Sequence, residues 1–182
     1  MRLFMFAASL RKESVNKKLI NLAAKLIQKD HTIDLADFSE FHLPIYNADI
    51  QNNEGFPVEV NKFIQRMHQA DAMILSLPEY NFSMPGTFKN LIDWVSRVTP
   101  MPWQKQRILL LSASPSLVGG NRGLWAARIP LESCGSLIFP DMFSLASAHE
   151  AFDEKGHLKQ ADLQKRLQQL LESYLILVKK LI

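Results

Sequence analysis

Few residues of this chain are suited to crosslinking or to metal binding. It has one cysteine, Cys134, in 182 residues, so no intrachain disulfide is possible. A single thiol among aliphatic neighbours is typical of a small buried side chain and favours a reducing, cytoplasmic compartment. The five histidines are scattered and form no cluster with metal-ligand spacing, so no metal site is predicted. Surface or structural roles are expected for His31, His42, His68, His149 and His157.

Long apolar runs and strong charge asymmetry are also missing. No apolar stretch approaches the ~18 residues that span a bilayer, so no membrane segment is expected. The first apolar run is short and ends before Arg11, which favours a buried strand over a secretion signal. The net charge is +3 and the basic residues alternate with acids, so no nucleic-acid partner is predicted. A local basic pocket for a phosphorylated cofactor explains the balance equally well.

Several catalytic motifs are absent. The chain contains no G-x-G-x-x-G, no P-loop, no G-x-S-x-G elbow and no H-E-x-x-H. These absences argue against Rossmann-type dinucleotide binding, P-loop phosphate binding, serine hydrolysis and zinc-dependent hydrolysis.

Short apolar runs alternate with helical patterns along the whole chain, which has no repeat or linker and is expected to form one domain over residues 1–182. Strands are predicted at Leu3–Ala8, Thr32–Ala36, Ala72–Leu77, Ile108–Leu111 and Leu137–Phe139. Helical periodicity follows from Leu19, at Val58–Met67, after Pro85, around Leu124–Leu131 and over Leu163–Val178. A long loop with an Asn/Gly-rich patch, Asn52–Gly55, is predicted after the second strand.

This alternation predicts a parallel sheet covered on both faces by right-handed crossovers. Five such units suit a three-layer αβα sandwich, either flavodoxin-like with strand order 2-1-3-4-5 or an incomplete Rossmann fold. In both folds ligands bind outside the carboxyl ends of the strands. The loops after strands 1, 3 and 4 are therefore the places to look for a site.

The loop after the first strand is rich in anion-binding groups. It reads SLRKESVN, from Ser9 to Asn16, and opens a helix. Helix N-termini present free N–H groups, and hydroxyl, guanidinium and amide groups are donors that a phosphate accepts. A capped helix start, with Ser14 or Asn16 as the cap and Arg11 solvated, explains the loop equally well.

The loop after the third strand reads PEYNFSMPG, from Pro78 to Gly86, and is stiffened by two prolines. Tyr80 and Phe82 offer a flat surface to a planar heterocycle. From the residues alone, a hairpin-like turn whose rings cover the core is slightly favoured. Ser83 is predicted to cap the following helix.

The loop after the fourth strand, Ser112–Gly123, contains Gly119 and Gly120, which permit close approach of the backbone to a ligand. A flexible strand-to-helix connection is the alternative. No single loop is decisive, but all three are predicted at one edge of the sheet.

These loops resemble those of the NADPH-dependent FMN reductase family, which includes chromate reductase-like and azoreductase-like quinone reductases. The most specific stretch is PEYNFSMPGTFKNLIDWVSR, from Pro78 to Arg97, which is similar to the family's P-E-Y-N-x-S-x-P-G-x-x-K-N-x-I-D-W segment. The SLRKESVN loop and an S-P-x-x-x-G-G-x-R loop match as well. AHEAFDEKGHL, from Ala148 to Leu158, resembles the segment before the family's last helix. The resemblance covers nearly the whole chain.

The resemblance implies a flavodoxin-like fold, bound FMN, and NADPH or NADH as the electron donor. It implies a small acceptor such as a quinone, azo compound, free flavin or chromate, and a homodimer or homotetramer. The implied phosphate ligands are Ser9, Arg11, Ser14 and Asn16. The implied neighbours of the isoalloxazine ring are Pro78, Glu79, Tyr80, Asn81 and Phe82, with Ser114, Gly119 and Gly120 near its pyrimidine end; Tyr80 is also a candidate contact for the acceptor.

One position departs from the family pattern: Ala8 stands where the family usually has glycine before the first serine. The added methyl group narrows the space for backbone approach, so weaker phosphate binding is expected, without its loss. On the following helix segment, salt bridging or a subunit contact is favoured for Lys89, Asn90, Asp93 and Arg97. A further set of apolar residues suggests a subunit interface, with core packing as the alternative: Met84, Phe88, Trp94, Met101 and Trp103.

A flavin-based mechanism needs no acid–base side chain, because the cofactor carries the chemistry and the protein supplies position and electrostatics. Nicotinamide and acceptor would occupy the exposed ring face in turn. A flavodoxin-type electron carrier is disfavoured by the pI near 9.0, since such carriers tend to be acidic. A non-catalytic flavin sensor stays open, and steady turnover of NADPH with a quinone would distinguish it from an enzyme.

Overall fold

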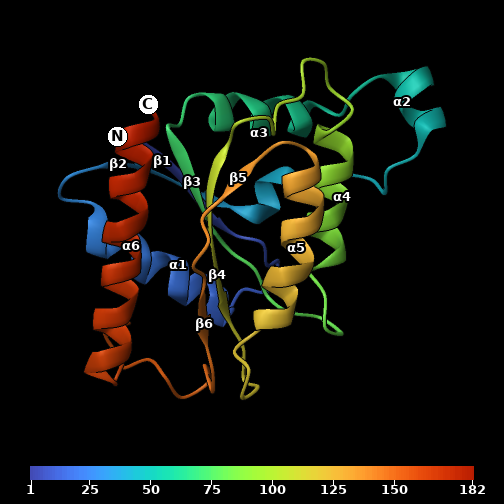
Figure 1. Ribbon diagram of the computed structural model, residues 1–182. Helices are drawn as coiled ribbons and strands as arrows, with labels where there is room; N and C mark the ends of the chain where they lie inside the picture. The colour runs from blue at the N-terminus through green and yellow to red at the C-terminus, as the bar shows by residue number, and fades with distance from the viewer.

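A parallel sheet between two layers of helices organises the protein (Figure 1). The computed structural model describes all 182 residues. The strands are β1 (Arg2–Ala7), β2 (Thr32–Asp37), β3 (Ala72–Ser76), β4 (Arg107–Ala113), β5 (Leu137–Ile138) and β6 (Phe143–Leu145). Their order is β2-β1-β3-β4-β5, with β6 paired to the carboxyl half of β4. The flavodoxin-like order predicted from the sequence is confirmed, with six strands where five were expected.

The helices divide between the two faces of the sheet. They are α1 (Val15–Ile27), the 3₁₀ turn η1 (Phe38–Phe41), α2 (Ala48–Glu54), α3 (Val58–His68), α4 (Gly86–Val95), α5 (Asn121–Ser133) and α6 (Ala161–Leu181). Helices α1 and α6 cover one face, and α3, α4 and α5 cover the other (Figure 1). This division follows from the right-handed crossovers that parallel strands require.

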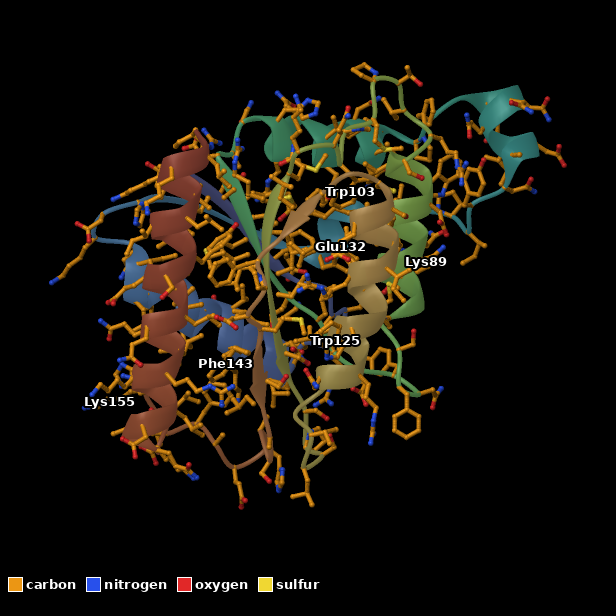
Figure 2. All side chains as sticks on the ribbon, in the orientation of Figure 1. Lys89, Trp103, Trp125, Glu132, Phe143 and Lys155 are labelled. Carbon is orange, nitrogen blue, oxygen red and sulfur yellow. The ribbon has the colours of Figure 1, made fainter.

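Each face of the sheet has its own core of 23 buried residues. Alternate residues of β1 enter opposite cores, because successive side chains of a strand point to opposite faces. Leu3 and Met5 pack under α1 and α6, whereas Phe4 and Phe6 pack under the other layer. Figure 2 marks one large side chain from each core, Phe143 and Trp103.

The outer strand beside β4 has two parts, of which the sequence predicted only the first, as Leu137–Phe139; β6 was not predicted. Ile108 pairs with Ile138 and Leu111 with Phe143, so three steps along β4 correspond to five along the outer chain. Pro140 lies in the interruption and has no N–H for the ladder. Because the strand resumes as β6, the chain after Leu145 reaches the carboxyl edge of the sheet beside the end of β4.

Three other expectations differ from the structure. The predicted long loop after β2 contains η1 and α2, and Asn47 caps α2 by accepting a hydrogen bond from the Asp49 N–H. Trp94 and Trp103 are fully buried, as is Phe88, so core packing explains them rather than a subunit interface. Cys134, which was expected to be buried, is only half-buried.

None of the helices combines the length and the hydrophobicity that crossing a membrane requires.

The turn after β2 is held to α1 by a charged pair. Asp37 accepts hydrogen bonds from the Ser39 N–H at 2.9 Å and from Lys17 Nζ at 3.0 Å. The Ser39 N–H, followed by Lys17, lowers the pKa of Asp37 from 3.8 to about 2. A carboxyl whose pKa is lower in the folded state stabilises the fold above its unfolded pKa, and this stabilisation is lost as the pH falls through the folded pKa.

We therefore expect Asp37→Asn to reduce the free energy of unfolding at pH 7 by less than about 1 kcal/mol, since half of the side chain is exposed and solvent screens the pair. The difference from wild type should shrink between about pH 4 and pH 2. Urea unfolding of both proteins across this range measures it. A difference that stays constant down to pH 2 would contradict the assignment.

Candidate functional site

The loops that follow β1, β3 and β4 meet at the carboxyl edge of the sheet, which lies at the bottom of Figure 1. Side-chain hydrogen bonds join them at their bases. Ser112 Oγ donates to the Leu77 carbonyl at 2.7 Å, and Asn16 bonds both Ser76 and Ala113. The structure thus brings together three segments whose bonded residues are 35, 60 and 97 positions apart in the sequence.

The first loop presents a row of unpaired donors. The backbone N–H groups of residues 10–15 donate to no other protein atom, because they precede the first internal bonds of α1. Ser14 is the N-cap of α1, as predicted, and its Oγ accepts from the Asn16 N–H at 3.2 Å. Arg11 is exposed and its guanidinium donates only to the Glu13 carbonyl. Free N–H groups at a helix N-terminus are the usual elements of an anion site.

The side chain of Asn16 differs from the other side chains of this loop in its hydrogen bonds to distant segments. It is 2% exposed, and its Oδ1 accepts from the Ala113 N–H and from Ser76 Oγ, both at 2.9 Å. Its Nδ2 donates to the Ala113 carbonyl at 2.8 Å. The side chain predicted as a phosphate ligand is therefore used inside the protein.

The second loop is a tight turn. Tyr80 and Ser83 exchange backbone hydrogen bonds at 2.9 and 3.0 Å, and Asn81 and Phe82 between them have φ of 52° and 61°. A left-handed conformation at phenylalanine costs about 1–2 kcal/mol and is worth explaining by function. The hairpin-like turn considered from the sequence is present, but its rings do not cover the core: Tyr80 is 53% and Phe82 65% exposed. The guanidinium of Arg122 lies 4.3 Å from the centre of the Phe82 ring.

Ser83 was predicted to cap α4, and this prediction is wrong. The N-cap position of α4 is Pro85, which makes no side-chain capping bond, and Ser83 belongs to the turn with Tyr80. The helix still begins at Gly86, close to the expected place.

Glu79 caps a different helix from across the site. Helix α5 has Gly120 at its N-cap position, so it lacks a capping side chain of its own. Glu79 Oε2 accepts from the Gly123 N–H at 3.0 Å and fills this role, which also suits the positive end of the helix dipole. Gly123 permits the approach, because a Cβ there would lie 3.1 Å from Glu79 Cβ. The bond fixes the second loop against the third.

The third loop is bounded by close backbone packing. Gly119 has φ of +63°, and a Cβ on it would lie 2.8 Å from backbone atoms of Leu145 and Ala146. Gly120 has φ of +85°, and a Cβ there would collide with Ser112 Oγ. Ser114 donates its N–H to the Leu145 carbonyl at 3.1 Å. Glycine is required at both positions by the fold, independently of any ligand.

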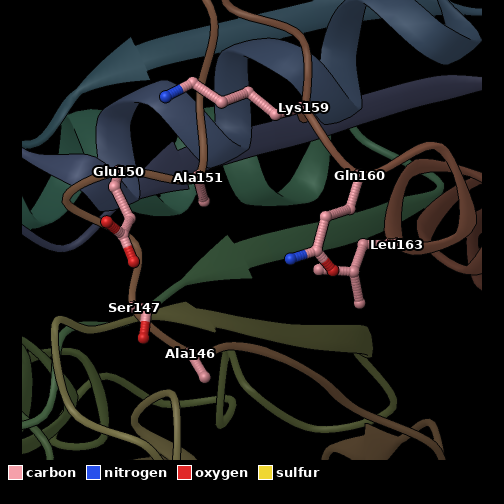
Figure 3. Close-up of a pocket in the computed structure, with 7 residues that line it drawn as sticks. All are labelled: Ala146, Ser147, Glu150, Ala151, Lys159, Gln160 and Leu163. Atoms are coloured by element: carbon pink, nitrogen blue, oxygen red, sulfur yellow. The ribbon is translucent and has the colours of Figure 1, made fainter.

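The chain after β6 is a part of the site that the sequence analysis did not identify. The Ser147 N–H donates to the Ser116 carbonyl and the Ala148 N–H to the Ser114 carbonyl, so this segment lies against the third loop. It continues into a pocket of about 260 Å³, which Figure 3 shows between this segment and the start of α6. The pocket includes Glu150, Lys159 and Gln160. The signal that could have located it is the broken β5–β6 strand.

The polar residues of α4 have structural roles. Lys89 and Asp93 form an ion pair at 2.7 Å, as predicted for this helix. Asn90 accepts from the Tyr46 N–H and donates to the Pro44 carbonyl, and the Arg97 guanidinium lies 5.1 Å from the centre of the Tyr46 ring. Helix α4 therefore anchors the segment between β2 and α2.

A flavodoxin-like sheet with free N–H groups at a helix start and exposed rings at its carboxyl edge is typical of a nucleotide-binding or flavin-binding α/β protein. Comparison with known proteins specifies the class. Residues 1–150 match the model of the family described as NADPH-dependent FMN reductase, and the chain belongs to this family.

Individual relatives agree with this assignment. The chain is 34% identical to an NAD(P)H-dependent FMN reductase from Pseudomonas aeruginosa, covering 96% of this chain and 94% of the relative. It is 32% identical to an NAD(P)H:quinone oxidoreductase from Solanum tuberosum, covering 95% and 90%. Among solved structures, the flavoenzyme NAD(P)H:(acceptor) oxidoreductase of Paracoccus denitrificans matches with a TM-score of 0.83 at 25% identity, covering 98% of this chain and 97% of that one.

These matches confirm the family, fold class, enzyme class and cofactors predicted from the sequence. The chain is an oxidoreductase that uses FMN and NAD(P)H.

The close packing at Gly119 gives a stability prediction. Gly119→Ala should lower the free energy of unfolding for two reasons. Alanine pays about 1–2 kcal/mol for a left-handed backbone conformation, and its Cβ displaces the β6 backbone at a cost of at least ~1 kcal/mol. Gly156→Ala is the matched control, because Gly156 has a similar φ of +80° and open space around its Cβ position. Urea unfolding of both variants measures the difference. Equal losses would show that contact with Leu145 and Ala146 adds nothing.

Proposed function

We propose that the three loops form the FMN site of a reductase that passes electrons from NAD(P)H to a quinone-type acceptor. The observation that carries this proposal is the placement of unpaired N–H groups at residues 10–15 beside a turn that exposes two aromatic rings. FMN has a phosphate at one end and a planar ring system at the other, so it needs both features on one surface.

The residues present fit a phosphate at the start of α1. Arg11 has a largely free guanidinium, and the Ser14 hydroxyl accepts from Asn16 and retains its own proton for donation. Ser9 lies two residues after the end of β1, and its hydroxyl has no protein partner in the structure. We assign the phosphate to these three side chains and the N–H groups of residues 10–15. Ala8, the residue before Ser9, is itself buried.

We assign the ring system to the surface between the second and third loops. Pro78 and Asn81 contribute backbone groups to this surface, and Tyr80 and Phe82 contribute their exposed rings. Glu79 contributes the hydrogen bond that holds α5 in place. Ser114, Gly119 and Gly120 border it from the other side. Bound FMN supplies the two-electron chemistry, whereas the protein supplies position and electrostatics. Arg122, whose guanidinium lies beside the Phe82 ring, would stabilise negative charge that develops on the ligand.

The acceptor class follows from the exposed surface and the relatives. Tyr80 and Phe82 form a flat apolar face that suits a planar quinone, and Tyr80 also carries a hydroxyl that can polarise its carbonyl. A relative that is 32% identical is named as a quinone oxidoreductase. The single free cysteine is compatible with a reducing compartment, and we propose the cytoplasm.

The experiment is anaerobic absorption spectroscopy of the purified protein supplied with FMN. We expect the visible flavin absorption to bleach when NADPH or NADH is added, and to return when a quinone is added. Bound FMN that neither nucleotide reduces would indicate an electron carrier or a sensor. Failure to bind FMN at micromolar concentration would overturn the assignment of the site.

We also propose that the protein forms a homodimer through the segment around α2. Helix α2 has no buried residue and stands away from the sheet in Figure 1, and nearby Ile45 is 81% exposed. Ile50 is the one side chain of this seven-residue helix that packs against a hydrophobic core. So short a helix with so little packing is marginal in water, and a second copy is the natural support for it.

Light scattering on a sizing column should therefore give about twice the chain mass, and Ile45→Asp should shift the protein toward the monomer. Glu54→Gln, a polar change on the exposed end of α2, is the control and should leave the mass unchanged. A monomeric wild type at micromolar concentration would contradict this proposal.

A further inference from the structure

We propose that Asn16 is a positioning residue for FMN, which fixes the phosphate-binding loop against the ring-binding loop without contacting the phosphate. This inference rests on the proposed function. It concerns the one predicted phosphate ligand whose side chain is hydrogen-bonded to the ends of two other strands, at Ser76 and Ala113.

The hydrogen-bonding capacity of Asn16 is almost fully used within the protein. Both acceptor positions of Oδ1 are taken, by the Ala113 N–H and Ser76 Oγ, and its backbone N–H donates to Ser14 Oγ. One Nδ2 hydrogen is taken by the Ala113 carbonyl, which leaves a single donor on a side chain that is 2% exposed. The orientation of the amide is unambiguous, because Ala113 offers one donor and one acceptor.

The position of these bonds explains why the side chain is needed. Ser76 is the last residue of β3 and pairs with Leu111, so β4 runs two residues further without a neighbour on that side. The N–H and C=O of Ala113 therefore face a gap in the ladder. The Asn16 amide fills it as a backbone peptide would, which avoids the cost of two buried unpaired groups.

The consequence for the site is a fixed spacing between its two ends. Asn16 is the second residue of α1, two positions after the Ser14 cap, and Ala113 directly precedes Ser114 of the third loop. A single rigid amide thus connects the anion-binding end of the site to the end assigned to the ring. A ligand that spans both ends depends on this distance.

Riboflavin and FMN provide the discriminating probes, because they differ only in the phosphate. Asn16→Asp keeps the acceptors for Ala113 and Ser76 and places an oxygen against the Ala113 carbonyl in place of the Nδ2 donor. We expect this variant to bind both FMN and riboflavin more weakly, with each Kd raised at least about tenfold as measured by flavin fluorescence quenching. Arg11→Ala is the matched control from the same loop and should weaken FMN alone.

Two results would overturn the proposal. Loss of FMN affinity with unchanged riboflavin affinity would make Asn16 a phosphate ligand. Unchanged Kd for both flavins, with only a lower unfolding temperature, would limit Asn16 to a role in stability.

Amide hydrogen exchange of the flavin-free protein gives a second, independent readout. Asn16→Ala should speed exchange of the Ala113 N–H by at least about tenfold, whereas Arg11→Ala should not change it. Equal protection in both would overturn the proposal. If the Asn16 variants do not fold, Ser76→Ala removes only the Ser76 bond and should weaken both flavins by a smaller, equal factor; an effect on FMN alone would again contradict it.

These readouts separate the two hypotheses. A wild-type protein that binds neither flavin would defeat the proposed function, while the exchange of the Ala113 amide would still report on the Asn16 bonds.

Discussion

Hydrogen bonds from side chains at the carboxyl edge of the sheet hold the candidate site together. Strand β4 extends past the end of β3, and the backbone groups exposed there must find partners because they are buried. Asn16 supplies them from α1, and Ser112 closes the other side by bonding the Leu77 carbonyl. The same bonds that complete the sheet therefore determine where the three loops leave it.

The two cores support this arrangement from both faces. With 23 buried residues on each side, the sheet offers a rigid base on which short loops can be held in strained conformations. The turn at Asn81 and Phe82 and the left-handed glycines at positions 119 and 120 are examples. Phe82 contacts Arg122 of α5, and Gly119 lies against Leu145 and Ala146, so the geometry of the site is a property of the assembled edge.

The chemistry assigned to the chain needs no acid–base side chain, because bound FMN carries the reactivity. Far from the site, burial raises the pKa of Tyr174, whose hydroxyl sits between the carbonyls of Met73 and Arg107. At the site the notable groups are backbone donors, a guanidinium, two exposed rings and a helix N-terminus. This composition is suited to holding and polarising a ligand that carries its own reactivity.

The sequence by itself determined the fold class and the family, and it predicted at which edge of the sheet a site would lie. Apolar runs mark buried parallel strands whatever their neighbours, and parallel strands place their following loops at one edge. The segment from Pro78 to Arg97 was specific enough to identify the family. The tertiary structure alone decided what individual polar residues do. The sequence predicted Asn16 and Glu79 as ligand contacts. In the structure their hydrogen-bond partners are Ala113 and Gly123, which lie 97 and 44 residues away along the chain. The break between β5 and β6 and the roles of Ser83 and Trp103 are similar cases, because a hydrogen bond or a buried surface between distant segments exists only once the chain has folded.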